Sequence, residues 1–146
     1  MWIKEPTRIN DTIDFLGTHE LCFYLVRGDN MLIVGGGMSH ASPALGAQLD
    51  TLRLEPSRVK YVVLTHSHFD HCGAIPYLRE RFPGVRVLGT AAAQQALAKQ
   101  KVADYNAKMN DFAAEQAQLR DRCLCLADRS DELAVDQVVN DGDVLN

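Results

Sequence analysis

The stretch VVLTHSHFDHCG, residues 62–73, joins an apolar run to three histidines and an aspartate. The apolar run that ends at Leu64 predicts a buried β-strand, and the polar residues after it predict a loop at the strand's carboxyl end. Side chains two positions apart point to the same side of an extended chain, so His66 and His68 present their imidazoles together. A turn then brings Asp70 and His71 to the adjoining volume. This spacing predicts a metal site made by His66, His68, Asp70 and His71.

The donor set does not select one metal. Imidazole nitrogens with one carboxylate suit zinc, iron or manganese. The chain has five histidines and none beyond position 71, so its later part adds no imidazole. His19 and His40 are isolated, and Cys72 is either a soft ligand or a small buried residue beside the site. The alternative for the whole motif is a polar loop without a metal.

The flanking sequence predicts an α/β chain. β-branched and aromatic residues predict strands, whereas Ser42 followed by Pro43 predicts the capped start of a helix. The last segment is expected to form a strand, a turn at Asp141-Gly142 and the start of another strand. In the long helical region Tyr105, Met109 and Phe112 are expected in the core, and the alternative is that their helix forms a wall over the substrate cleft. The expected strands are 8–17, 20–27, 31–34, 59–64 and 85–88, and the expected helices are 42–54, 74–82 and 91–121.

Composition excludes several kinds of partner. The 146 residues are 47% hydrophobic with a formal charge of −4, as expected for one domain with one core. No basic stripe is present, so neither nucleic acid nor an anionic membrane is an expected partner. The N-terminus lacks a signal peptide, and no apolar stretch is long enough to span a membrane. The sequence therefore predicts a cytoplasmic protein with reduced cysteines that acts on a small molecule.

The segment VVLTHSHFDHCGAIPYL (62–78) resembles the H-x-H-x-D-H signature of the metallo-β-lactamase superfamily. The segment FYLVRGDNMLIVGGGMS (23–39) is similar to the superfamily's N-terminal hairpin and glycine turn. The order of elements resembles the N-terminal half of that fold. The resemblance implies an αββα sandwich, of which residues 1–146 form the N-terminal part of a single domain: a mixed sheet with helices on one face.

The same resemblance implies a metal-dependent hydrolase of thioester, lactone or other ester bonds. His66 and His68 would hold the first of two ions, zinc before iron or manganese, and Asp70 and His71 the second. A hydroxide shared by the two ions would be the nucleophile, and Asp70 would be the catalytic residue that orients it.

Two departures from the family accompany this resemblance. First, the aspartate that usually follows the hairpin strand is replaced by the Val34-Gly35-Gly36 region. Second, the family's remaining metal ligands are expected beyond residue 146, so the metal site of this chain is expected to be incomplete. The alternatives are therefore a non-catalytic metal-binding half-domain that pairs with another chain and, less favoured, a diiron oxygen-reducing relative. That branch usually has a glutamate where this chain has His68.

A half-sandwich should expose one face of its sheet. We expect that face to include some of a set of apolar strand residues, and to be covered by a second copy in a homodimer or by the missing C-terminal half. The set is Val62, Leu64, Val87, Ile33 and Leu32.

Overall fold

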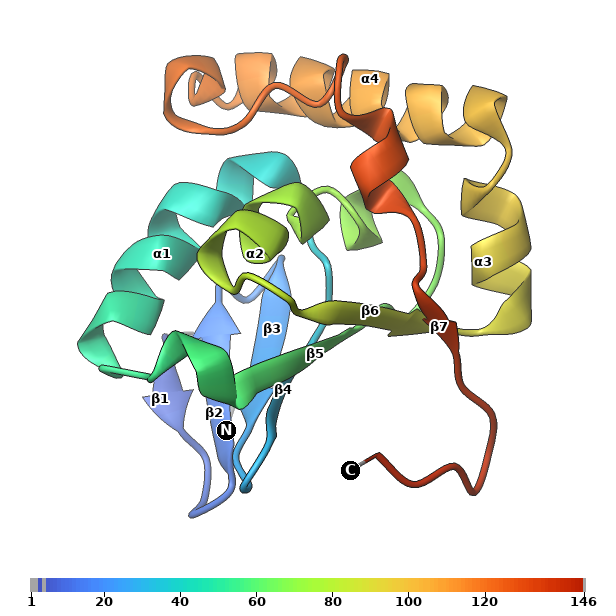
Figure 1. Cartoon of the computed structure of the whole chain (residues 1–146). Coiled ribbons are helices and arrows are strands. Elements are labelled where there is room, and N and C mark those ends of the chain that lie inside the picture. Colours follow the sequence, from blue (N-terminus) through green and yellow to red (C-terminus); the bar gives the residue numbers. More distant parts are fainter. Residues whose placement is uncertain (1–2, 4, 146) are drawn as a thin grey trace.

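The computed structural model describes residue 3 and residues 5–145. A seven-stranded mixed sheet lies at its centre, with the strands in chain order (Figure 1). The first four strands are antiparallel, and the last four run parallel to one another because helices connect them. The strands are β1 (Thr7–Arg8), β2 (Ile13–Gly17), β3 (Cys22–Val26), β4 (Met31–Val34), β5 (Val59–Val63), β6 (Arg86–Gly89) and β7 (Gln137–Val138).

Two helices, α1 (Ser42–Thr51) and α2 (Ile75–Arg81), cover one face of the sheet. The helix α3 (Ala91–Leu97) follows β6, and α4 (Gln100–Gln116) crosses the top of the molecule in Figure 1. Short 3-10 helices complete the chain: η1 (Ser39–Ala41), η2 (Pro56–Arg58), η3 (Phe69–His71), η4 (Arg120–Arg122) and η5 (Ser130–Leu133). No described helix is long and apolar enough to cross a membrane.

The core lies between the sheet and the helices α1 and α2. Its strand residues are in register: Leu25 pairs with Ile33, and Ile33 with Val62, so their side chains share one face. The fully buried residues packed from the two sides of this layer are Phe23, Leu25, Ile33, Val62 and Val87 with Leu45, Leu49, Ile75 and Leu78. The predicted mixed α/β sheet with helices on one face is confirmed.

Three local expectations were wrong. Ser42 does not cap α1 but is its first residue, and Ala41 occupies the N-cap position without a side-chain bond. The C-terminal segment forms η5 and the two-residue strand β7, and after the turn at 141–142 no second strand forms in the described part, which ends at residue 145. Finally, Tyr105 and Phe112 are 57% and 55% exposed rather than in the core.

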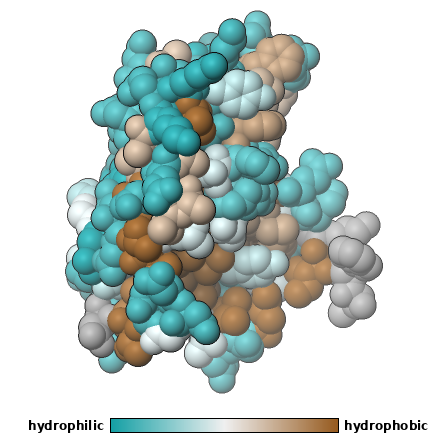
Figure 2. Space-filling model, turned by 90° about the vertical axis from the view of Figure 1, so that its right-hand side faces the viewer, coloured by the Kyte–Doolittle hydropathy of each residue, from teal (hydrophilic) through white to brown (hydrophobic). Residues whose placement is uncertain are grey.

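The side of the sheet away from α1 and α2 carries only one of the five residues from which we expected this face to be drawn. Ile33, Val62, Leu64 and Val87 are buried in the core beneath the helices. Only Leu32 lies on the opposite face, where the register also places a row of half-exposed apolar residues: Tyr24, Val26, Val34 and Val63. Figure 2 shows hydrophobic side chains gathered mostly in the lower half of the side that carries β7 and the C-terminal segment.

We predict that the face of the sheet away from α1 and α2 mediates self-association at micromolar concentration. Tyr24, which is 37% exposed, lies beside Val34 on this face, so Tyr24→Glu should weaken the dimer by placing a charge in an apolar contact. Sedimentation velocity measures the effect, with Tyr105→Glu on α4 as the matched control. A wild-type chain that stays monomeric and binds no apolar dye would contradict the prediction.

Candidate metal centre

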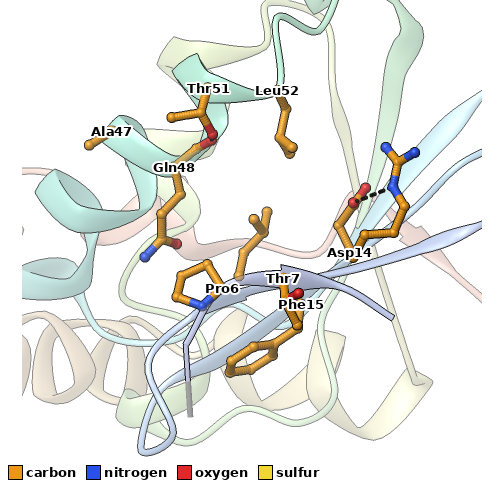
Figure 3. A pocket seen from close by; sticks show the side chains of 10 residues that line it. Pro6, Thr7, Asp14, Phe15, Ala47, Gln48, Thr51 and Leu52 are labelled. Atoms are coloured by element: carbon orange, nitrogen blue, oxygen red, sulfur yellow. Dashed lines mark hydrogen bonds and ion pairs between the residues drawn. The ribbon is translucent and has the colours of Figure 1, made fainter. Parts of the chain in front are cut away.

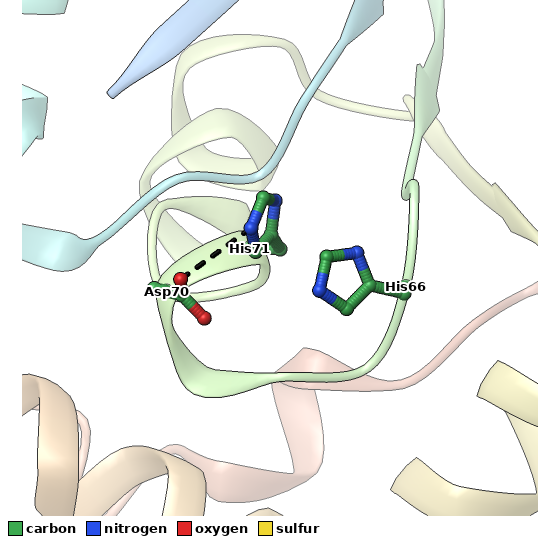
Figure 4. A group of neighbouring side chains, drawn as sticks. All are labelled: His66, Asp70 and His71. Atoms are coloured by element: carbon green, nitrogen blue, oxygen red, sulfur yellow. Dashed lines mark ion pairs between the residues drawn. The ribbon is translucent and has the colours of Figure 1, made fainter. Parts of the chain in front are cut away.

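The predicted metal loop, residues 64–74, leaves the sheet after β5 and turns back through η3 into α2. Three of its side chains converge: ligand atoms of His66, Asp70 and His71 all lie within 4.8 Å of one another (Figure 4). The ring centroids of His66 and His71 are 3.9 Å apart. His68 lies edge-on to His66 with centroids 4.8 Å apart, but it is not a member of this group of three. The division of the four residues between two ions stays a prediction.

Electrostatics in the loop favour the neutral form of the His66 imidazole. Partial burial lowers the pKa of His66, the neighbouring rings of His71 and His68 lower it further, and Asp70 opposes the shift. A metal ion binds only the unprotonated nitrogen of an imidazole, so a lowered pKa keeps His66 ready for ligation at neutral pH. Asp70 Oδ2 lies 3.4 Å from His71 Nε2. An ion held by both side chains would take the place of this contact.

Thr65 fixes the opposite side of two rings. Its Oγ1 lies 3.3 Å from Nδ1 of His66 and 3.3 Å from Nδ1 of His71. A hydroxyl oxygen has two acceptor lone pairs and can therefore accept from both Nδ1–H groups at once. That arrangement leaves both Nε2 atoms unprotonated, which is the form in which they bind a metal ion.

A glycine segment, residues 35–39, supports the metal loop from one side. The backbone N–H groups of Gly73 and Ala74 donate to Gly37 O and Gly36 O at 2.8 and 2.7 Å. A Cβ on Gly36 would collide with His71 O, so only glycine permits this close approach. The Val34-Gly35-Gly36 region, where the family has an aspartate, therefore supports the metal loop through the backbone.

Two buried asparagines on α4 hold the loop from the other side. Asn110 donates from Nδ2 to Phe69 O at 2.7 Å and accepts at Oδ1 from Ser39 N at 2.9 Å. Asn106 donates to Ser67 O at 2.8 Å. A Cβ on Gly73 would collide with the Asn110 side chain, so that glycine lets the helix come close. Asn110 thus ties together α4, the metal loop and the glycine segment.

Sequence reasoning missed these asparagines because it sought apolar periodicity on this helix. The buried face of α4 consists of Ala103, Asn106, Ala107, Asn110 and Ala114, all small or polar. The available signal was the repeat of two asparagines four positions apart among alanines, which places both on one helix face. A polar pair on a face of small residues indicates close backbone packing with specific hydrogen bonds.

The other predicted site residues lie outside the cluster. Cys72 is fully buried, its Sγ accepts from Asn106 Nδ2, and burial is the largest cause that raises the pKa of its thiol to about 12. His40 follows the glycine segment and lines a cleft together with Asp70, whereas His19 is exposed beside Glu20. Among the described residues, no other group of three His, Cys, Asp or Glu side chains could hold a metal ion.

A separate hollow of about 550 Å³ lies between α1 and the β1–β2 edge of the sheet (Figure 3). Its polar side chains are already paired. Asp14 binds Arg8 and Arg27, and Gln48 donates to Gly17 O and accepts from Gly17 N. The Gln48 bonds join the edge of the sheet to α1. Asp14 and Gln48 thus have partners within the protein, and their presence in this hollow does not indicate a ligand.

Replacing Asn110 with alanine should lower the free energy of unfolding by about 2–4 kcal/mol. The change leaves Ser39 N–H and Phe69 C=O without their partner and opens a small cavity. Urea denaturation measures the loss. Lys108→Ala, on the exposed side of the same helix, should change the free energy by no more than about 0.5 kcal/mol. Equal effects of the two substitutions would show that Asn110 does not anchor the loop.

The structure has a mixed sheet with helices on one face and a His/Asp cluster at the carboxyl end of a parallel strand. These features define an α/β protein with a candidate metal site. A family model described as the metallo-beta-lactamase superfamily matches residues 17–143. The chain belongs to this superfamily, whose members are mostly hydrolases that generally bind metal ions.

Individual relatives agree with this assignment. A hydroxyacylglutathione hydrolase from Stenotrophomonas maltophilia is 43% identical over 47 residues, which are 32% of this chain and 18% of that protein. A metallo-beta-lactamase from Cronobacter sakazakii, a mutant of its HARLDQ motif, has a TM-score of 0.67 at 21% identity. The match covers 97% of this chain and 49% of that one.

The metallo-beta-lactamase MIM-1 from Novosphingobium pentaromativorans has a TM-score of 0.57 at 28% identity, over 64% of this chain and 34% of that one. The matched segments of all three proteins cover less than half of their lengths.

Proposed function

We propose that this chain carries part of the active site of a metal-dependent hydrolase that cleaves thioester, lactone or other ester bonds. The observation that carries the proposal is the convergence of His66, Asp70 and His71 within 4.8 Å at the end of β5. Two imidazoles and a carboxylate, with a third imidazole from His68 nearby, are a donor set that fits zinc and also accepts iron or manganese. The binding of two ions in the complete site, with zinc first, belongs to the same proposal.

A divalent ion held by His66, Asp70 and His71 would lower the pKa of a coordinated water towards about 7 and so supply a nucleophile at neutral pH. The residues of this chain prepare the site for that chemistry. When both rings are protonated at Nδ1, Thr65 Oγ1 accepts from both of them, and the Nε2 atom of each ring is left to bind the ion. Asp70 provides the negative charge of the cluster, and its carboxylate is the group placed to orient a nearby water.

The bond class rests on the relatives. Two of the similar curated proteins are named hydroxyacylglutathione hydrolases. Because this chain matches 18% and 24% of their lengths, the likeness supports a hydrolase and leaves its substrate to be measured. The competing proposal is a non-catalytic metal-binding half-domain, which the incomplete ligand set of the described residues favours. The cytoplasmic location also stays a prediction.

We expect the chain to bind one divalent metal ion weakly and to hydrolyse model thioesters, lactones and aryl esters slowly, because three clustered ligands hold an ion less firmly than a complete site. Metal content after dialysis against a mild chelator and rates with added Zn²⁺ or Mn²⁺ measure both properties. His66→Ala should remove them, whereas His19→Ala, outside the cluster, should not.

The outcomes separate the two proposals. Metal binding that depends on His66 without any metal-dependent cleavage would favour the non-catalytic half-domain. Tight retention of two equivalents would contradict the expected weak site. Metal binding that is unchanged in His66→Ala would remove the cluster as the metal centre.

Thr65→Val should weaken Zn²⁺ binding roughly 10- to 100-fold, because the valine side chain cannot accept from the two Nδ1–H groups. Competition with a chelating dye measures the affinity. Thr65→Ser keeps the hydroxyl and should restore binding. Thr65 is exposed, so neither substitution should alter the unfolding midpoint by more than the surface range of about 0.5 kcal/mol. Equal affinities of the valine and serine variants would contradict the role of the hydroxyl.

A further inference from the structure

An apolar cleft adjoins the metal loop. It has a volume of about 720 Å³, and its walls come from four separate parts of the chain. Phe69 and Asp70 belong to the metal loop, and Met38 belongs to the glycine segment. Leu21, from the turn between β2 and β3, and Met109, on α4, line the remaining sides. The cleft therefore runs from a residue of the proposed metal centre to the surface of a helix.

The face of α4 that borders the cleft is unusually apolar for an exposed surface. Because the buried face of the helix is made of small residues, its largest apolar side chains lie on the other faces. Met109 and Phe112, three positions apart on the same side, both line the cleft, and Phe112 is 55% exposed. Exposed apolar side chains beside a concave surface are typical of a ligand-binding site.

Charge in the cleft limits the kind of ligand. Two of its lining residues are acidic, Glu20 and Asp70, and none of the described residues that line it is lysine or arginine. Away from the metal centre, a carboxylate or phosphate on the ligand would meet Glu20 without a lysine or arginine of the lining to pair with it. An uncharged ligand with an apolar chain meets Leu21, Met109 and Phe112 without that cost.

We propose that this cleft binds the apolar chain of an uncharged ester or lactone and places its reacting carbonyl beside Asp70. The assignment of the carbonyl rests on the proposed hydrolase function, whereas the binding of the chain stands on the cleft alone. Substrate choice then comes from α4 and the β2–β3 turn, and not from the metal loop. Glu20, which lies in that turn, selects against anionic substrates.

Methyl ketones test the proposal, because they keep the carbonyl of an ester and cannot be hydrolysed. NMR titrations of the metal-free chain with 2-hexanone, 2-octanone and 2-decanone should show affinity rising roughly two- to fourfold per methylene group. Octanoate, with the chain length of 2-octanone and a negative charge, should bind more weakly than the ketone. Shifts should centre on Phe69, Met109 and Phe112.

Two substitutions on α4 form a matched pair. Phe112→Ser should weaken 2-decanone binding roughly tenfold, because the ring covers part of the chain. Tyr105→Ser removes an equally exposed ring that does not line the cleft and should leave the affinity unchanged. Circular dichroism verifies that both variants are folded.

The possible results are decisive. Affinity that does not depend on chain length, octanoate binding as tightly as 2-octanone, or equal losses in the two serine variants would overturn the proposal. Ketone binding with the expected pattern, in a chain that shows no metal-dependent cleavage, would support the cleft as a ligand site and contradict the hydrolase function.

Discussion

The hydrogen bonds of Asn110 are the constraint on which the candidate site depends. One buried amide accepts from Ser39 N and donates to Phe69 O, so it joins the glycine segment, the metal loop and α4. Unpaired polar groups in this position would be costly, because water cannot reach them. This arrangement fixes the backbone at Phe69, beside Asp70, and so contributes to the convergence of His66, Asp70 and His71.

The same contact explains why α4 differs from an ordinary amphipathic helix. Close approach to the loop requires alanine and asparagine on the buried face and glycine at position 73 opposite Asn110. Large apolar residues cannot fit there, and Met109 and Phe112 are left facing outwards. The support of the metal loop and the apolar wall of the adjoining cleft are thus two results of one packing requirement.

The sequence predicted where the strands and helices lie along the chain better than it predicted which face of each one is buried. The apolar run before Thr65 and the density of histidines after it predicted β5, the loop and their junction, because both signals are local. The long-range contacts could not be predicted in this way. Apolar spacing suggested a buried Phe112, and Ser42 looked like a cap, because the choice between the two faces of an element depends on partners far along the chain. Four of the five strand residues expected on the open face, Ile33 among them, proved to lie under the helices for the same reason.

The bonds between α4 and the metal loop also set an order of events during synthesis. Asn110 follows Phe69 by 41 residues and Ser39 by 71. A growing chain emerges from the ribosome with its N-terminus first, so the histidine loop is exposed before the helix that orders it has been made. Contacts of such separation form late, after the local strand and turn structure. The histidines of the nascent chain are therefore exposed before α4 can fix their geometry, and the ligand cluster takes its final shape only when α4 docks.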